Sequence, residues 1–172
     1  MRVTTLRLVL VGALAALASA LVLTGAVGAK DRKRGKATFG ALKAKMSGDQ
    51  EAPGPGDEDG TGKAFVQVLP QYDALCFRLK WRDIADPTAA HIHAGEAGVA
   101  GDVVVPLFVT PEEVRDRGCV DGLDDELLRS LKRDPQDFYV NVHNADFPGG
   151  AIRGQLRTVR RRGGGGGHKR GR

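Results

Sequence analysis

The chain has 172 residues, of which 26 are Lys or Arg, 21 are Asp or Glu and only two are Cys. A single domain usually takes about 100 to 150 residues, so this length excludes a multidomain enzyme. The two cysteines exclude a disulfide-dense miniprotein, and the 27% of charged residues excludes a polytopic membrane protein.

The N-terminal segment has the layout of a signal peptide over residues 1–29. Arg2 and Arg7 precede an uncharged stretch at residues 8–29 that ends in small side chains. This order predicts export with cleavage after Ala29. The alternative is an uncleaved membrane anchor, because 22 uncharged residues are long enough to span a hydrocarbon core of about 30 Å.

Basic residues are concentrated near the two ends of the chain. Residues 30–36 carry five Lys or Arg and one Asp, which predicts a basic linker, and residues 157–172 carry seven Lys or Arg. A run of five glycines predicts that residues 158–172 are a disordered tail, because such a run buries nothing. Outside the cell, this tail is expected either to contact an anionic envelope polymer or lipid surface, or to act only as a solubilising segment.

The segment between the two basic ends is acidic. Residues 37–156 contain 12 Lys and Arg against 20 Asp and Glu, a net charge of −8. The basic pI therefore comes from the ends of the chain, and no basic face on the folded part is obvious from the sequence. Nucleic acid is accordingly not an expected partner.

Alternation of polar and apolar residues dominates this central segment and predicts β-strands. Seven strands are expected, at residues 42–46, 63–69, 75–81, 89–93, 102–109, 137–143 and 151–157. Clusters of Gly, Pro and Asp separate them, which is typical of an all-β, antiparallel β-sandwich with Greek-key-like connections. One short helix is expected around residues 123–131, capped by Asp121 or Asp124 and ended by Asp134-Pro135.

The two cysteines form a candidate disulfide. Cys76 lies in a predicted strand and Cys119 in a predicted loop, so neither has the close spacing of a zinc knuckle or a redox motif. An even number of cysteines in an exported chain predicts that the two are bonded to each other. The alternative is a pair of buried free thiols.

Three histidines form the strongest candidate for a chemical site. His91 and His93 are two residues apart in a predicted strand and therefore project from one face of it. His143 shares the face of its own strand with Asn141 and Tyr139. If the two strands lie side by side, the three imidazoles converge and become ligands for zinc or copper. The alternative is that each ring only forms hydrogen bonds to carbonyl or carboxylate groups.

The sequence offers little support for other kinds of active site. Ser47 and Ser130 are the only serines after residue 29, and neither lies in a Gly-x-Ser-x-Gly motif. The Gly-rich segment at residues 95–101 lacks the spacing of a phosphate-binding loop and precedes a strand, so we interpret it as a turn.

Four segments of the chain stand out in a specific order. They read MSGDQEAP at residues 46–53, AAHIHAGEAGVAGDVVV at 89–105, YVNVHN at 139–144 and FPGGAIRGQL at 147–156. Together they closely resemble the CHRD domain, which is named for the animal morphogen antagonist chordin, and the resemblance covers residues 37–157. It implies an extracellular β-rich domain with no established catalytic activity or cofactor. The function that it implies is a non-catalytic extracellular or cell-envelope binding module with an unknown ligand.

The last of these segments also suggests a structural contact. In the strand that it predicts, Arg153 and Gln155 share one face. Arg153 is a candidate for a buried or half-buried ion pair with Glu51, Glu96 or Asp102, which would hold loops together.

The His-x-His strand, the later histidine and the Gly-rich loops are also similar to the copper/zinc superoxide dismutases, sandwiches in which a His-x-His pair supplies metal ligands. That similarity is short. It implies an alternative function as a zinc- or copper-binding protein, including metal-dependent redox activity, with His91, His93 and His143 as ligands.

Overall fold

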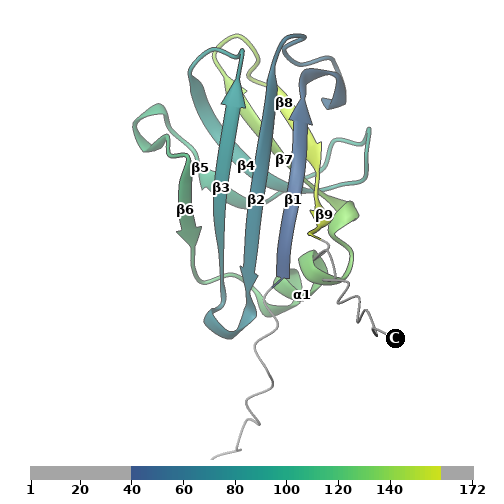
Figure 1. The fold of residues 1–172 in the computed structure, drawn as a ribbon, viewed down its shortest axis with the longest axis vertical. Helices are drawn as coiled ribbons and strands as arrows, with labels where there is room; N and C mark the ends of the chain where they lie inside the picture. Colours follow the sequence, from purple (N-terminus) through teal and green to yellow (C-terminus); the bar gives the residue numbers. More distant parts are fainter. Residues whose placement is uncertain (1–39, 160–172) are drawn as a thin grey trace, which may run out of the picture. The chain divides into compact units, whose positions relative to one another are not determined.

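The computed structural model describes residues 40–159, which form a mostly β domain (Figure 1). The strands are β1 (Gly40–Ser47), β2 (Thr61–Leu69), β3 (Ala74–Arg82), β4 (Pro87–Ala94), β5 (Val103–Phe108), β6 (Arg117–Val120), β7 (Phe138–Asn144), β8 (Ile152–Gln155) and β9 (Arg157–Thr158). The helix is α1 (Asp125–Arg133), and single 3-10 turns lie at Gly48–Gln50, Pro70–Tyr72, Pro111–Glu113 and Pro135–Asp137.

Some sequence predictions concern segments outside the described residues. These segments are the signal peptide at residues 1–29, the basic linker at 30–36 and the tail from residue 160 onward. The first two residues after Leu156 lie in β9, which pairs with β1. Between residues 40 and 159, none of the helices has the length and apolar character needed to cross a membrane.

Hydrogen bonds join all nine strands into one antiparallel sheet. Its order is β5-β4-β7-β8-β1-β2-β3-β6, and β9 lies beside β1. The edge strands β5 and β6 contact each other, so the sheet curls into a nearly closed, barrel-like shape. The prediction of an all-β antiparallel fold with one short helix is confirmed. The two strands that the sequence did not predict, β6 and β9, have four and two residues, too few for a clear alternating pattern.

The inward-facing residues of the strands form the core of the domain. In β1, for example, Leu42, Ala44 and Met46 are buried, whereas the intervening Lys43 and Lys45 are exposed. This alternation repeats along β2 and β3, since successive side chains of a strand point to opposite faces. The polar and charged side chains of these strands therefore lie on the outer face of the sheet.

Helix α1 contributes to the core from one end of the sheet. Its Leu128 and Leu131 are fully buried, and the helix lies beside the lower ends of β1 and β2 in Figure 1. The Asp124 carboxylate caps the helix by accepting hydrogen bonds from the backbone N–H groups of Glu126 and Leu127, at 2.9 and 3.1 Å. Of the two predicted caps, Asp124 is the one that the fold uses.

The two cysteines form a disulfide between neighbouring strands. Cys76 of β3 and Cys119 of β6 are directly opposite in the sheet register, and their sulfur atoms are 2.03 Å apart. The predicted pairing is confirmed. Cys119 lies in the short strand β6 rather than in a loop.

Candidate metal centre

A layer of polar side chains covers the outer face of β4, β7 and β8. The register aligns two rows across these strands: His91, Asn141 and Arg153 in one row, and His93, Tyr139 and Gln155 in the next. Many of these side chains are buried although they point away from the core, because loops fold over them. The main cover is the loop at residues 95–102, whose carbonyl groups accept hydrogen bonds from this layer.

The three predicted histidines meet in this layer. Strands β4 and β7 are paired, as the hypothesis required. His143 is two residues after Asn141 on the same face of β7, and it lies opposite Ala89 of β4. His91 Nδ1 and His143 Nε2 are 3.1 Å apart. One ligand nitrogen from each of the three rings lies within 4.8 Å of the other two. The convergence that a metal site needs is therefore present in the fold.

Backbone carbonyl groups determine which ring nitrogens carry a proton. His93 Nδ1 lies 2.8 Å from the carbonyl oxygen of Gly101, and His143 Nδ1 lies 3.0 Å from that of Pro148. A carbonyl oxygen can only accept, so both Nδ1 atoms donate and both Nε2 atoms keep a lone pair when the rings are neutral. A metal-binding histidine usually has this arrangement, in which the second ring nitrogen donates to a carbonyl or carboxylate.

Burial favours the metal-binding form of His91 and His143. Desolvation, together with the nearby His143 and His93, lowers the pKa of His91 to about 4. Desolvation also lowers the pKa of His143, although its hydrogen bond to Pro148 acts in the opposite direction. A neutral imidazole is the ligand form, so protons do not compete with a metal ion for His91 at neutral pH.

The nitrogen positions are compatible with zinc or copper. Zinc–nitrogen bonds of about 2.0 to 2.1 Å place two ligands of a tetrahedral ion about 3.3 Å apart, close to the 3.1 Å between His91 and His143. The 4.8 Å limit for the whole set means that the third ring has to move by about 1 to 1.5 Å to complete such a site. A square copper geometry needs less movement, since opposite ligands there are about 4 Å apart.

The loop above the histidines depends on a glycine. A Cβ atom on Gly101 would lie 1.6 Å from the carbonyl oxygen of Ala94, so no other residue fits this position without moving the backbone. The N–H of Gly101 donates to the Tyr139 hydroxyl at 3.2 Å, and the Tyr139 ring stacks on His93 with centroids 4.8 Å apart. The Gly-rich segment is thus the turn that was predicted, and it also orients His93.

Arg153 is buried, but its partners differ from the prediction. It is 1% exposed, and its guanidinium carbon lies 3.4 Å from the centre of the Tyr139 ring, a cation–π contact. Its Nη2 donates to the backbone carbonyl of Glu96 at 2.7 Å. Within residues 40–159 it has no carboxylate partner within 4.0 Å, so the predicted ion pair with Glu51, Glu96 or Asp102 is wrong.

The other predicted motif residues lie around this arginine. Gln155 Nε2 donates to the carbonyl groups of Gly95 and Gln136, at 2.6 and 2.7 Å, and so ties the covering loop to the turn that precedes β7. Asn141 lies between His91 and Arg153, with its buried Oδ1 unpaired. Glu51 Oε1 is also buried without a partner, and desolvation raises the pKa of Glu51 to about 7 although Arg153 acts to lower it.

Sequence reasoning found the three rings but missed the groups that orient them. The carbonyl oxygens of Gly101 and Pro148 belong to loops, and every residue has a carbonyl group, so residue identity gives no signal for them. The only available clue was the glycine at position 101, which permits the close approach to Ala94.

Comparison with known proteins identifies a family. The sequence model of the family described as the CHRD domain matches residues 42–156, which include most of β1, all of β2 to β8 and α1. No curated protein and no solved structure matches the chain.

Proposed function

This chain belongs to the CHRD domain family, and we propose that its folded domain is an exported binding module whose ligand is a zinc or copper ion held by His91, His93 and His143. The observation that carries the proposal is the buried Nε2 of His93. This atom has a lone pair and no hydrogen-bond partner among residues 40–159, while its neighbours in space are the two other imidazoles.

The alternative explanation, that the rings are only structural struts, accounts for part of the geometry. The hydrogen bonds of His93 and His143 to backbone carbonyls would hold the loops in place without any metal, and His143 Nε2 would accept a hydrogen bond from His91 Nδ1 at 3.1 Å. It does not account for the burial of an unpaired Nε2, which costs roughly 1 to 3 kcal/mol when no partner compensates it. A metal ion supplies that partner and uses the existing carbonyl contacts to orient two of its three ligands.

Export is part of the same proposal. The disulfide between Cys76 and Cys119 supports it, because such bonds persist in oxidising compartments and are rare in the cytosol. Outside the cytoplasm, a three-histidine site would act as a scavenger or carrier of metal, or provide a fourth position for water or substrate. Of these roles, the ligand set itself supports only metal binding.

The test is metal analysis of protein that was purified without a histidine tag. Incubation with micromolar zinc or copper followed by gel filtration should leave about one equivalent of metal per chain. The substitutions His93→Gln and His143→Gln, made together, should abolish retention. His168→Gln is the matched control, because it removes a histidine from the C-terminal segment, outside residues 40–159.

Each outcome of this experiment bears on the proposal. Protein that retains neither metal would contradict it, and so would retention that survives the double substitution but is lost in the His168 variant. For copper, a visible absorption band that disappears in the double variant gives a second readout that does not depend on the chromatography. Circular dichroism of the variants separates loss of ligands from loss of fold.

A further inference from the structure

The outer face of the sheet on the side away from the histidines is basic. It is formed by β1, β2, β3, β6 and β9, and none of these strands contains an Asp or Glu. Its exposed cationic residues are Lys43, Lys45, Lys63, Arg78, Lys80, Arg82, Arg117 and Arg157. We call this surface the basic face. It exists although residues 37–156 have a net charge of −8, which is why no basic face was obvious from the sequence.

Several of these cations lie directly opposite one another. The register places Lys45 opposite Lys63, and Lys63 opposite Lys80. Neighbouring strands are about 4.8 Å apart, so the three lysines form a row with about that spacing. Like charges directly opposite each other destabilise a sheet, and none of the three has an ion-pair partner among the described residues. Fold stability therefore does not explain this row.

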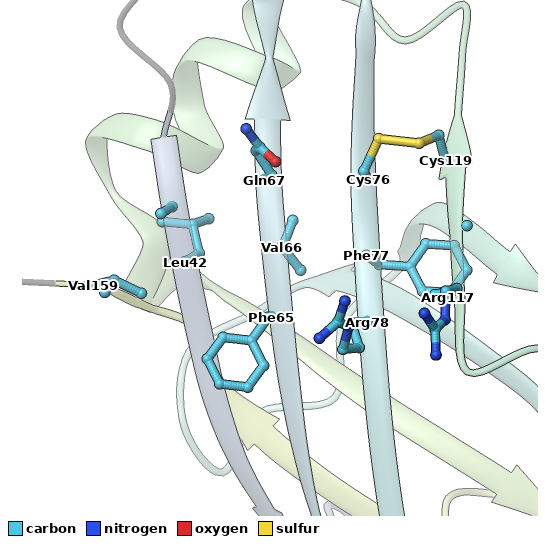
Figure 2. A pocket seen from close by; sticks show the side chains of 12 residues that line it. Leu42, Phe65, Val66, Gln67, Cys76, Phe77, Arg78, Arg117, Cys119 and Val159 are labelled. Carbon is cyan, nitrogen blue, oxygen red and sulfur yellow. A yellow bond between two sulfur atoms is a disulfide. The ribbon is translucent and has the colours of Figure 1, made fainter.

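An aromatic ring lies at the centre of the basic face. Phe65 of β2 is 46% exposed, and in the register it lies between Lys43 of β1 and Arg78 of β3. Figure 2 shows Phe65, Arg78 and Arg117 across β2, β3 and β6, below the disulfide, where they line a shallow hollow. Two further hollows border the same ring, one beside Lys45 and Arg157 and one beside Lys80. A flat apolar surface surrounded by positive charge is thus open to solvent.

The acidic residues leave this face largely unneutralised. Asp116 pairs with Arg117 at the edge formed by β6, at 3.2 Å, and both side chains are more than half exposed. Such a surface pair is worth at most about 1 kcal/mol. On the helix, Asp125 and Glu126 pair with Arg129, so the ion pairs of these two acidic residues lie within α1 and not on the basic face. Among residues 40–159, no ion pair compensates the cations at the centre of the basic face.

We propose that the basic face binds an acidic polysaccharide, a chain of carboxylated or sulfated sugars that lies across the strands. Its anionic groups would lie over the row formed by Lys45, Lys63 and Lys80, and the apolar side of one sugar ring would pack on Phe65. Charge complementarity carries the proposal, since a polymer with regularly repeated negative charges matches a row of regularly spaced ammonium groups. The site is separate from the histidine cluster and does not depend on metal binding.

Other anionic partners fit the basic face less well. Insertion into a lipid surface requires several apolar side chains, and among the large exposed hydrophobic residues of the described chain only Phe65 lies on this face. Binding of single-stranded nucleic acid generally uses aromatic rings on which successive bases stack, and here there is one ring. These partners are the competing outcomes of the test.

The experiment measures binding of the full chain to oligogalacturonate, with neutral dextran as the reference polymer. The variant K45Q/K63Q/K80Q should weaken binding by roughly tenfold or more at low salt. The variant F65A should weaken it severalfold while leaving salt dependence unchanged. The matched control R115Q/R129Q/R133Q removes the same charge from the loop before β6 and from α1, and should change affinity by about twofold at most.

All variants keep the C-terminal segment, so a difference between them reports on the basic face alone. Equal losses in the lysine variant and in the control would overturn the proposal, because they would indicate a response to net charge only. Unchanged binding in the lysine variant would also overturn it. Tighter binding to phosphatidylglycerol vesicles or to a single-stranded oligonucleotide than to oligogalacturonate would reassign the face to that partner. Thermal unfolding of each variant establishes that the fold is intact.

Discussion

Glu51 has a buried carboxylate oxygen that has no hydrogen-bond partner among the described residues. Its carboxylate lies against Gly150, where a Cβ atom would come within 2.5 Å of it and where φ is +140°, so only glycine fits. Desolvation raises the pKa of Glu51 to about 7, with Arg153 opposing the shift. The fold therefore favours the protonated acid, whereas the unfolded chain releases this proton near its ordinary pKa of about 4.3.

This difference predicts a pH dependence of stability. Between about pH 4.5 and 7 the folded state holds one proton more at Glu51 than the unfolded state, so the free energy of unfolding falls as pH rises through this window. The loss is at most about 3.5 kcal/mol, and solvent screening of the partly exposed group reduces it. Glu51→Gln mimics the neutral acid and should flatten this part of the curve, as measured by urea unfolding at pH 5, 6, 7 and 8.

The control for this experiment is Glu58→Gln, which removes an exposed carboxylate from the same connection between β1 and β2. His91 contributes a slope of the opposite sign, because its lowered pKa makes the unfolded state hold the extra proton. The contribution of a single group to the pH dependence is therefore the difference between the free energy of unfolding of the wild type and that of the variant. Parallel curves for wild type and Glu51→Gln would show that Glu51 ionises normally in the fold.

At the residue scale, identities and spacing predicted the histidine cluster but not its environment. The period of two along a strand is enough to place His91 and His93 on one face. It does not say what a long side chain will touch, and Arg153 illustrates the difference. Its burial was foreseen, but its contacts are the Tyr139 ring and a backbone carbonyl, which depend on how the loop at residues 95–102 folds back.

At the scale of elements, the disulfide is the main tie of the edge strand β6. This strand has four residues, and it pairs with β3 alone in the sheet. A four-residue edge strand buries little surface of its own, with half of its residues exposed and none buried. The bond between Cys76 and Cys119 closes a loop that spans 43 positions of sequence and includes β4 and β5.

Removing this bond should lower stability by about 3 to 4 kcal/mol in the chain-entropy model, since an open loop of this length gives the unfolded chain more freedom. The double variant Cys76→Ala, Cys119→Ala tests this by chemical denaturation against wild type. Reduction of the wild type with dithiothreitol is the matched control, because it breaks the same bond and keeps both side chains. A variant as stable as the wild type would mean that β6 packing, and not the covalent link, holds this edge.

Most strands were predictable because polar and apolar residues alternate along them. The strands with six or more residues and the short strand β8 were all expected near their observed positions, because a half-buried strand repeats every two residues. The two that were missed, β6 and β9, are short edge segments whose pairing is set by their neighbours. Their residues 117–120 and 157–158 carry no periodic signal of their own.

At the scale of the whole molecule, the net charge of the folded part did not predict how charge is distributed over its surface. The acidic sum over residues 37–156 hid a basic face, because a sum carries no information on position. The alternating lysines and arginines of β1 and β3 were visible in the sequence, but the order β1-β2-β3 and the register that aligns them were not. Different parts of the outer face consequently have different chemistry, with buried and half-buried histidines over β4 and β7 and exposed cations over β1, β2 and β3.

The C-terminal segment provides a second source of positive charge, and its contribution can be separated from that of the basic face. Residues 160–172 contain six Lys or Arg and no acidic residue. We predict that a chain ending at Val159, which keeps β9, unfolds at the same denaturant concentration as the full chain but binds anionic vesicles and oligogalacturonate more weakly. Charges on this segment act on an anionic surface through electrostatics that are screened over about 8 to 10 Å near physiological ionic strength, so this loss should shrink as salt is added.

The truncation and the K45Q/K63Q/K80Q variant should differ in what they affect. Without residues 160–172, affinity for vesicles and affinity for the polysaccharide should fall to a similar extent, because the positive charge of these residues attracts either anionic surface. Without the lysine row, the loss should be larger for the polysaccharide, because only the ordered row matches its repeat. A chain ending at Val159 that is retained on both surfaces as well as the full chain would mean that the segment only solubilises the protein, and the basic face would then account for all of the binding.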